Sequence, residues 1–183
     1  MQTSIIMSGF GGQGVMFAGQ LLAYAGMDQG YHVTWIPSYG PEMRGGTANC
    51  TVIISDEPIG APLVKKPDIV AALNLPSFEK YEDVINVGGL FVVNSSIVSV
   101  ETERDDIETV YVPANDIAEK QGTTKMMNMA IVGAMLAKRP FLTIAAIEQA
   151  LHDHIPASKA KLLDANVRVL QLGYEAAFNQ VAA

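Results

Sequence analysis

The chain has 183 residues, of which 49% are hydrophobic and only 17% are charged, and its formal net charge is −7. This length and composition predict a single domain over residues 1–183 with a substantial apolar core. The shortage of charge also hints at a surface that is covered by a partner. Because no run of Lys or Arg longer than two is present, we expect neither a nucleic-acid-binding surface nor a basic membrane-surface helix.

Cysteine and histidine give no sign of a metal centre. The single cysteine, Cys50, cannot by itself form an internal disulfide, hold an iron–sulfur cluster or build a structural zinc site. The histidines His32, His152 and His154 lack the spacing of metal ligands. No signal-peptide pattern and no run of 18 apolar residues occur, so we expect a cytoplasmic protein without membrane contact.

The first half of the chain alternates short apolar runs with helical ones. Residues 4–8 predict a buried strand, and 9–14 a loop. A helix follows, with Gly30 as its expected end, because apolar residues recur at helical spacing at Val15, Ala18, Leu22 and Ala25. Further strands are predicted over 31–36, 48–55, 68–73 and 90–94, and a further helix over 77–85.

The second half is mainly helical, with short strand candidates at 98–100 and 110–112. Asn115 is expected to cap a short helix that ends near Lys120, and Thr143 to cap another. Residues 126–137 predict a helix that is apolar nearly all round. The last helix carries an apolar stripe of Leu163, Val167, Leu170, Tyr174 and Phe178. This alternation predicts an α/β fold, a three-layer α/β/α sandwich with a mainly parallel, Rossmann-like sheet.

The segment Gly-Phe-Gly-Gly-Gln-Gly at 9–14 fits the pattern G-x-G-x-x-G between a predicted strand and a predicted helix. Glycine lets the backbone turn sharply and approach a ligand, and the free N–H groups of a helix N-terminus attract an anion. The alternative is that these glycines only allow the helix to pack closely on the strand. The candidate binding residues in this segment are Gly9, Gly11, Gly12, Gln13 and Gly14.

A conventional dinucleotide site needs a second feature, which is missing here. An Asp or Glu should end the second strand, about 20 residues farther on, to bind the ribose. Residues 33–37 are Val-Thr-Trp-Ile-Pro, and the nearest acid, Glu42, lies inside the following loop. A phosphate-binding P-loop is not expected either, since no Gly-Lys-Ser/Thr follows the glycines.

Residues 38–47 have neither helical nor strand periodicity and are rich in Gly and Pro. They follow the second predicted strand, at the sheet edge where open α/β sheets bind ligands. This loop adds Ser38, Tyr39, Glu42 and Arg44 to the candidate binding residues. Arg44 can form a forked contact with a phosphate or carboxylate, or it can pair with Glu42 and hold the loop together.

Three segments resemble the gamma subunit of 2-oxoacid:ferredoxin oxidoreductases, a module that is also fused into one-chain pyruvate:ferredoxin oxidoreductases. They are Gly-Phe-Gly-Gly-Gln-Gly-Val at 9–15, Ser-Tyr-Gly-Pro-Glu-Met-Arg-Gly-Gly at 38–46 and Ser-Asp-Glu-Pro-Ile at 55–59. The resemblance covers most of residues 4–140, including 128–133, and the first two segments carry the candidate binding residues position by position.

The resemblance implies a complex that oxidatively decarboxylates a 2-oxoacid with coenzyme A and passes the electrons to ferredoxin. Thiamine diphosphate, Mg and the iron–sulfur clusters would belong to alpha, beta and ferredoxin-like delta subunits. This chain would bind no cofactor alone and would carry neither catalytic residues nor metal ligands. It would complete the assembly and contribute to the coenzyme A site.

The resemblance favours the 2-oxoglutarate type, whose product would be succinyl-CoA, because that type has a compact separate chain. A subunit of a pyruvate or branched-chain 2-oxoacid enzyme would look similar. Two other hypotheses stay open at this point. A stand-alone nucleotide-binding oxidoreductase is disfavoured by the missing ribose carboxylate, and a purely structural module is disfavoured by the polar loop at 38–47.

Overall fold

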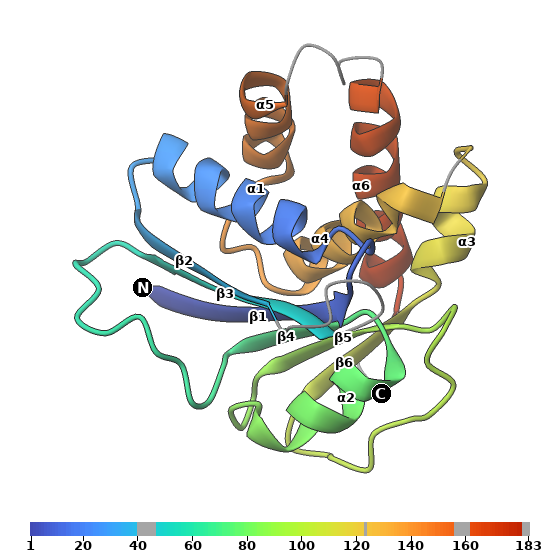
Figure 1. The fold of residues 1–183 in the computed structure, drawn as a ribbon, viewed down its shortest axis with the longest axis horizontal. Helices are drawn as coiled ribbons and strands as arrows, with labels where there is room; N and C mark the ends of the chain where they lie inside the picture. Colours follow the sequence, from blue (N-terminus) through green and yellow to red (C-terminus); the bar gives the residue numbers. More distant parts are fainter. Residues whose placement is uncertain (40–46, 123, 156–161, 181–183) are drawn as a thin grey trace.

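The computed structural model describes residues 1–39, 47–122, 124–155 and 162–180 (Figure 1). In chain order, its elements are β1 Gln2–Phe10, α1 Val15–Asp28, β2 His32–Tyr39, β3 Thr47–Ser55, β4 Ile69–Ala72, α2 Leu75–Tyr81, η1 Glu82–Val84, β5 Leu90–Asn94, β6 Glu108–Val112, α3 Ala114–Glu119, η2 Thr124–Met126, α4 Met127–Lys138, α5 Ile144–His154 and α6 Leu163–Phe178, where η marks a short 3-10 helix. Among the described residues, no helix is both long and apolar enough to cross a membrane.

The strands form one six-stranded sheet in the order β2-β3-β1-β4-β5-β6. Strands β1, β4, β5 and β6 pair in parallel, whereas β3 is antiparallel to both of its neighbours. The reversal of β3 follows from its connection to β2, because residues 40–46 are too few for the crossover that parallel neighbours need. The predicted α/β class with a mainly parallel sheet is therefore confirmed, with one strand reversed.

Helices cover both faces of the sheet, as predicted, but unequally. Figure 1 shows α1, α3, α4, α5 and α6 on one face and α2 on the other. The larger core packs under the first group and includes Leu22, Met129 and Leu170. The smaller core lies under α2, where the rings of Phe78 and Phe91 have their centroids 5.0 Å apart.

Most predicted elements are present, and two local predictions are wrong. Thr143 caps α5 as expected, since its hydroxyl accepts a hydrogen bond from the Ala146 N–H. Residues 98–100 form no strand, because the chain turns where the Ile97 and Val98 N–H groups both donate to the Asn94 carbonyl. Asn115 does not cap α3; Pro113 stands at the N-cap position.

Helices α4 and α6 cross at two glycines. A Cβ atom on Gly133 would collide with the Leu170 carbonyl oxygen, and one on Gly173 would collide with the backbone of Ala130. The two backbones therefore approach as closely as only glycine allows. This contact places α6 across α4 and completes the larger core.

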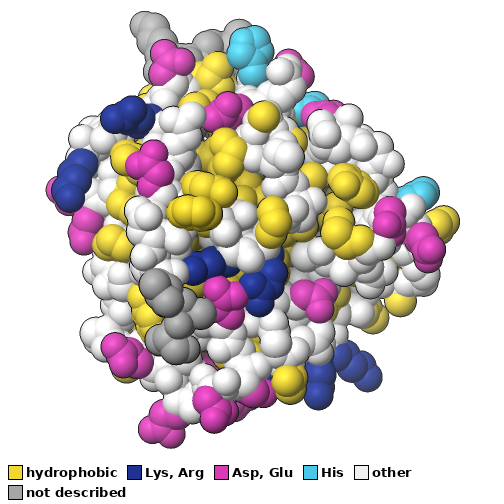
Figure 2. Space-filling view, turned by 180° about the vertical axis from the view of Figure 1, so that it is seen from behind, with side chains coloured by type: hydrophobic (Ala, Val, Ile, Leu, Met, Phe, Trp, Pro, Cys, Tyr) yellow, Lys and Arg dark blue, Asp and Glu magenta, His cyan; other side chains and the backbone are white. Residues whose placement is uncertain are grey.

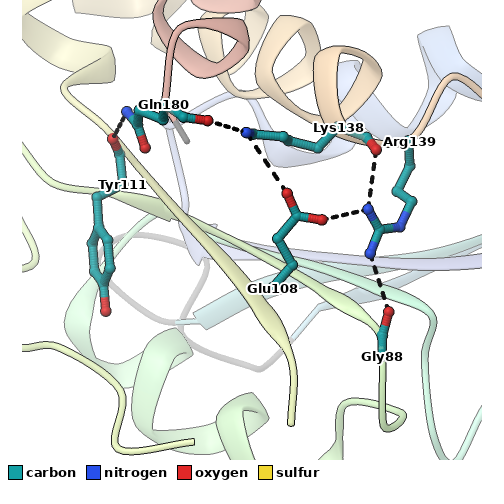
Figure 3. Close-up of polar contacts among 6 residues, drawn as sticks. All are labelled: Gly88, Glu108, Tyr111, Lys138, Arg139 and Gln180. Atoms are coloured by element: carbon teal, nitrogen blue, oxygen red, sulfur yellow. Dashed lines mark hydrogen bonds and ion pairs between the residues drawn. The ribbon is translucent and has the colours of Figure 1, made fainter. Parts of the chain in front are cut away.

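Polar contacts fasten the end of α4 to β6 and to the segment after α6 (Figure 3). Glu108 on β6 accepts hydrogen bonds or ion pairs from both Lys138 and Arg139. Lys138 also donates to the Gln180 carbonyl, and the Gln180 side chain donates to the Tyr111 carbonyl at 2.7 Å. Gln180 thus occupies part of the β6 sheet edge. Figure 2, which shows the back of the molecule, has hydrophobic side chains gathered over its upper part, with basic and acidic side chains beside and below them.

Candidate functional site

The sheet register brings the two candidate segments together at the carboxyl edge. Phe10 at the end of β1 pairs with Thr47 at the start of β3, and Ala48 pairs with Tyr39 at the end of β2. The loop predicted over 38–47 was drawn too wide, since Ser38 and Tyr39 belong to β2 and Thr47 to β3. These two strand ends lie beside the glycine turn over 11–14, on three adjacent strands. Glu42 and Arg44 fall outside the described residues, and of Tyr39 only the backbone position is described.

Ser38 lies at this edge on the α2 face of the sheet. Its register partner is Asn49, which in turn pairs with Ser8 on β1. The Ser8 hydroxyl accepts a hydrogen bond from the Ser77 hydroxyl in α2 at 2.9 Å, and side chains paired across strands share a face. Ser38 is exposed, and two strand spacings, about 10 Å, separate it from β1.

The glycine turn begins where β1 ends and leads directly into α1. Gly12 and Gly14 have φ angles of 99° and 76°, in the left-handed region that favours glycine. Gly14 is the N-cap of α1 and supplies no side chain to accept from the first N–H groups. Asn128 fastens this turn to α4, since its Nδ2 donates to the Gly14 carbonyl at 3.0 Å.

Gln13 is turned inward, toward the strands. Its Oε1 accepts a hydrogen bond from the Phe10 N–H at 2.6 Å, and its Nε2 donates to the Leu73 carbonyl at 3.1 Å. A Cβ atom on Gly9 would lie 2.5 Å from that Oε1 atom. Of the predicted site residues, Gly9 therefore makes room for Gln13, while Gly11 and Gly12 are exposed.

Carboxamide side chains continue along the carboxyl ends of β4, β5 and β6. The Asn74 Oδ1 accepts from the Ser77 N–H at 2.9 Å and so caps α2. The Asn94 Nδ2 donates to the Asn115 Oδ1 at 2.9 Å and lies 3.5 Å from the Leu73 carbonyl. We call these residues, together with Gln13 in the glycine turn and Asn128 bound to it, the amide network. Its members are Gln13, Asn74, Asn94, Asn115 and Asn128.

Apart from Asn115, which the sequence suggested only as a helix cap, three members of the amide network were not among the sequence candidates: Asn74, Asn94 and Asn128. All three are buried, with at most 2% of their surface exposed. A signal was available for each of them. Asn74 and Asn94 follow apolar runs at strand ends, where open α/β sheets place functional side chains, and Asn128 is the lone polar residue in an apolar helix.

A cavity of about 480 Å³ lies along α1, on the side opposite the sheet. Phe17, Leu21 and Met126 make its apolar wall, and the ring of Tyr24 stacks on His154 with the centroids 4.1 Å apart. The His154 Nε2 lies 2.9 Å from the Asp28 carboxylate, which holds the end of α5 against α1. Gly14 of the glycine turn and Asn128 of the amide network line this cavity, whereas the exposed Gly11 and Gly12 do not.

Residues 4–176 match the family described as pyruvate ferredoxin/flavodoxin oxidoreductase. The chain belongs to this family. The resemblance seen in the glycine turn and the 38–46 segment is thereby confirmed, and it extends to the C-terminal helices.

Relatives within the pyruvate ferredoxin/flavodoxin oxidoreductase family differ in length. Ketoisovalerate oxidoreductase subunit VorA of Methanothermobacter thermautotrophicus is 38% identical over 95% of this chain, but the chain spans only 36% of VorA. The 2-oxoglutarate synthase subunit KorC of Methanocaldococcus jannaschii is 34% identical, with 97% of this chain and 95% of KorC aligned. The same domain thus occurs as a separate chain and within a longer one.

A solved gamma subunit has the same fold. The gamma subunit of keto/oxoacid ferredoxin oxidoreductase from Geobacter sulfurreducens superposes with a TM-score of 0.84 and 29% identity, covering 97% of both chains. The mixed six-stranded sheet with helices on both faces is therefore the fold of that gamma subunit as well.

Proposed function

We propose that this chain is the gamma subunit of a 2-oxoacid:ferredoxin oxidoreductase and that its carboxyl edge contributes to the coenzyme A site of the complex. Alpha, beta and delta subunits would supply thiamine diphosphate, Mg and the iron–sulfur clusters, and ferredoxin would accept the electrons. The full-length alignment with KorC and the gamma subunit from Geobacter sulfurreducens support the subunit assignment.

The juxtaposition of the glycine turn with the ends of the 38–47 loop carries the coenzyme A proposal. Coenzyme A has anionic phosphates, and the turn offers backbone N–H groups at the start of a helix whose N-cap, Gly14, has no side chain. The loop that holds Arg44 begins and ends beside the same turn, at Tyr39 and Thr47. A guanidinium there would add a forked, charge-assisted contact to a phosphate.

For the 2-oxoacid, we propose 2-oxoglutarate, with succinyl-CoA as the product. KorC relatives support this choice because they align with this chain over nearly their whole length. A branched-chain 2-oxoacid is the second candidate, favoured by the higher identity to VorA. The ratio of kcat/KM for 2-oxoglutarate, 2-oxoisovalerate and pyruvate in the purified complex decides between them, and a preference for 2-oxoisovalerate would reverse our order.

Arg44→Ala tests the coenzyme A proposal in the assembled complex. A charge-assisted contact contributes about 1.5–3 kcal/mol, so the apparent KM for coenzyme A should rise about 10- to 100-fold. Decarboxylation of the 2-oxoacid, assayed without coenzyme A, should stay unchanged. Arg44→Lys should recover part of the affinity, because an ammonium keeps the charge and loses the planar fork.

The matched control is Arg168→Ala, at an exposed arginine on α6. Its KM for coenzyme A should equal that of the wild type. If Arg44→Ala leaves coenzyme A dependence unchanged in an intact complex, Arg44 does not contact coenzyme A. If the complex instead dissociates, Arg44 holds the subunits together.

A further inference from the structure

The point at which the chain reverses its direction across the sheet lies between β1 and β4. From β1 the chain adds β2 and β3 on one side, and from β4 it adds β5 and β6 on the other. Strand β1 leads into α1 on one face, and β4 leads into α2 on the opposite face (Figure 1). The connections after these two strands therefore diverge, which is the geometry of the crevice where open α/β sheets bind nucleotides.

In this chain the side chain of Gln13 spans that crevice. Its carboxamide bonds the Phe10 N–H on the β1 side and the Leu73 carbonyl on the β4 side, at 2.6 and 3.1 Å. The Asn74 Nδ2 lies 3.5 Å from the Gln13 Oε1, the atom that accepts from Phe10. The backbone adds a third link across the turn, since the Gln13 N–H donates to the Phe10 carbonyl at 3.1 Å.

Gly9 leaves room for the Gln13 carboxamide, whereas a residue with a Cβ atom at position 9 would not. A Cβ atom on Gly9 would lie 2.5 Å from Gln13 Oε1 and 2.9 Å from the Leu73 Cβ, so only glycine fits beside the carboxamide. A dinucleotide in the crevice would have to displace Gln13 and would find no acid at the end of β2 for its ribose.

We propose that Gln13 is a positioning residue that closes the β1–β4 crevice from within and thereby sets the glycine turn for a ligand bound on its outer side. Gly11 and Gly12, at the crest of the turn, are exposed. The carboxamide is uncharged, so it fixes the turn without repelling an anion there. The identity of the ligand, the phosphate groups of coenzyme A, rests on the proposed function; the closure by Gln13 does not.

The closure is tested in the full-length chain by amide hydrogen exchange. Gln13→Ala removes the acceptor of the Phe10 N–H, so exchange at Phe10 should accelerate about 10-fold, which corresponds to 1.4 kcal/mol. Gln149→Ala is the matched control, because it removes a single carboxamide bond, to Asp153, on the exposed surface of α5. Unchanged exchange at Phe10 in Gln13→Ala would overturn the proposal whatever the ligand is.

The positioning role is tested in the assembled complex. Gln13→Ala should raise the KM for coenzyme A about 10-fold with kcat within a factor of two. Gln13→Glu should raise this KM at least as much, because its carboxylate can accept from Phe10, cannot donate to Leu73, and places a negative charge under the turn. A merely structural side chain would change stability and leave the ratio of KM to kcat unaltered.

Two patterns of results would overturn the positioning role and are distinguishable. If Arg44→Ala raises the KM for coenzyme A and Gln13→Ala does not, the coenzyme A site stands and Gln13 has no part in it. If neither variant changes that KM, the proposed coenzyme A site is itself wrong, and the positioning role falls with it.

Discussion

At the residue scale, the thiol of Cys50 is enclosed by the residues that pack around it. Cys50 on β3 is fully buried and pairs with Met7 on β1. A Cβ atom on Gly19 of α1 would collide with its sulfur, so the helix rests directly on the thiol. Burial raises the pKa of Cys50 to about 12, because a thiolate would lose its hydration there. Burial and this raised pKa therefore favour a packing role for Cys50 over a nucleophilic one.

Alkylation measures this enclosure. At pH 8 the folded chain should keep Cys50 unmodified by iodoacetamide, since the thiolate is the reactive form and burial suppresses it. In denaturant the same thiol should react completely within minutes. Intact-mass measurement distinguishes the two states, and rapid labelling of the folded chain would show that α1 opens readily from the sheet.

At the scale of elements, the crossing of α4 and α6 is a close backbone contact within the larger core. Gly133 and Gly173 bring the two backbones together without intervening side chains. An alanine in a helix is normally better than glycine by about 1 kcal/mol. Here the added methyl group would meet backbone atoms, which cannot rotate away, so steric cost exceeds that gain.

Gly133→Ala should accordingly lower the free energy of unfolding by about 1–3 kcal/mol, the usual range for overpacking. Urea denaturation of the full chain measures the change. Gly60→Ala is the control, because Gly60 has open space around the position of its Cβ and no positive φ. Equal stability of both variants would mean that the helices separate at little cost.

Sequence periodicity predicted helices and strands correctly where one face, or every face, of the element is apolar. Strand β5 has the predicted limits, because its apolar run follows Gly89 and ends at Asn94, and the apolar stripe predicted for the last helix lies within α6. Residues 98–100 alternate apolar and polar side chains as a strand does, but Val98 is buried directly after a turn, where its N–H donates to the Asn94 carbonyl. The reversed direction of β3 could not be read from its own residues, because direction depends on the length of the preceding connection.

The candidate site was predictable in part for a similar reason. Glycines and charged loop residues stand out in a sequence, so the glycine turn and the 38–47 loop were identified. The inward orientation of Gln13 was not, because its partners Phe10 and Leu73 contribute backbone atoms that have no sequence signature. Asn94 reaches its partner Asn115 across 21 residues, and no local pattern announces such a pair.

At the scale of the whole molecule, the two faces of the sheet are unequally covered. Helices α1, α3, α4, α5 and α6 pack on one face, whereas α2 and η1 cover β4 and β5 on the other. Near the carboxyl edge, Ser38 and Ile36 on β2 stay exposed on that second face. This arrangement suits a chain that finishes its packing against other subunits.

We therefore expect the isolated chain to fold and to lack turnover. The assay is 2-oxoacid-dependent reduction of a viologen dye with coenzyme A present, with the reconstituted complex as the positive control. The physical reason is the single, buried Cys50, which cannot supply the ligands of an electron-transferring cluster. Turnover by the purified chain alone would contradict the subunit proposal.

None of the five carboxamides in the amide network gains or loses a proton in the ordinary working range of an enzyme. The shape of the carboxyl edge that they hold together should therefore be the same in mildly acidic and mildly alkaline solution. Inflections in the rate profile of the proposed complex would then report groups outside this network. In kinetic terms, the contribution of this edge to the rate should not change with pH, so each inflection can be assigned to an ionising group elsewhere.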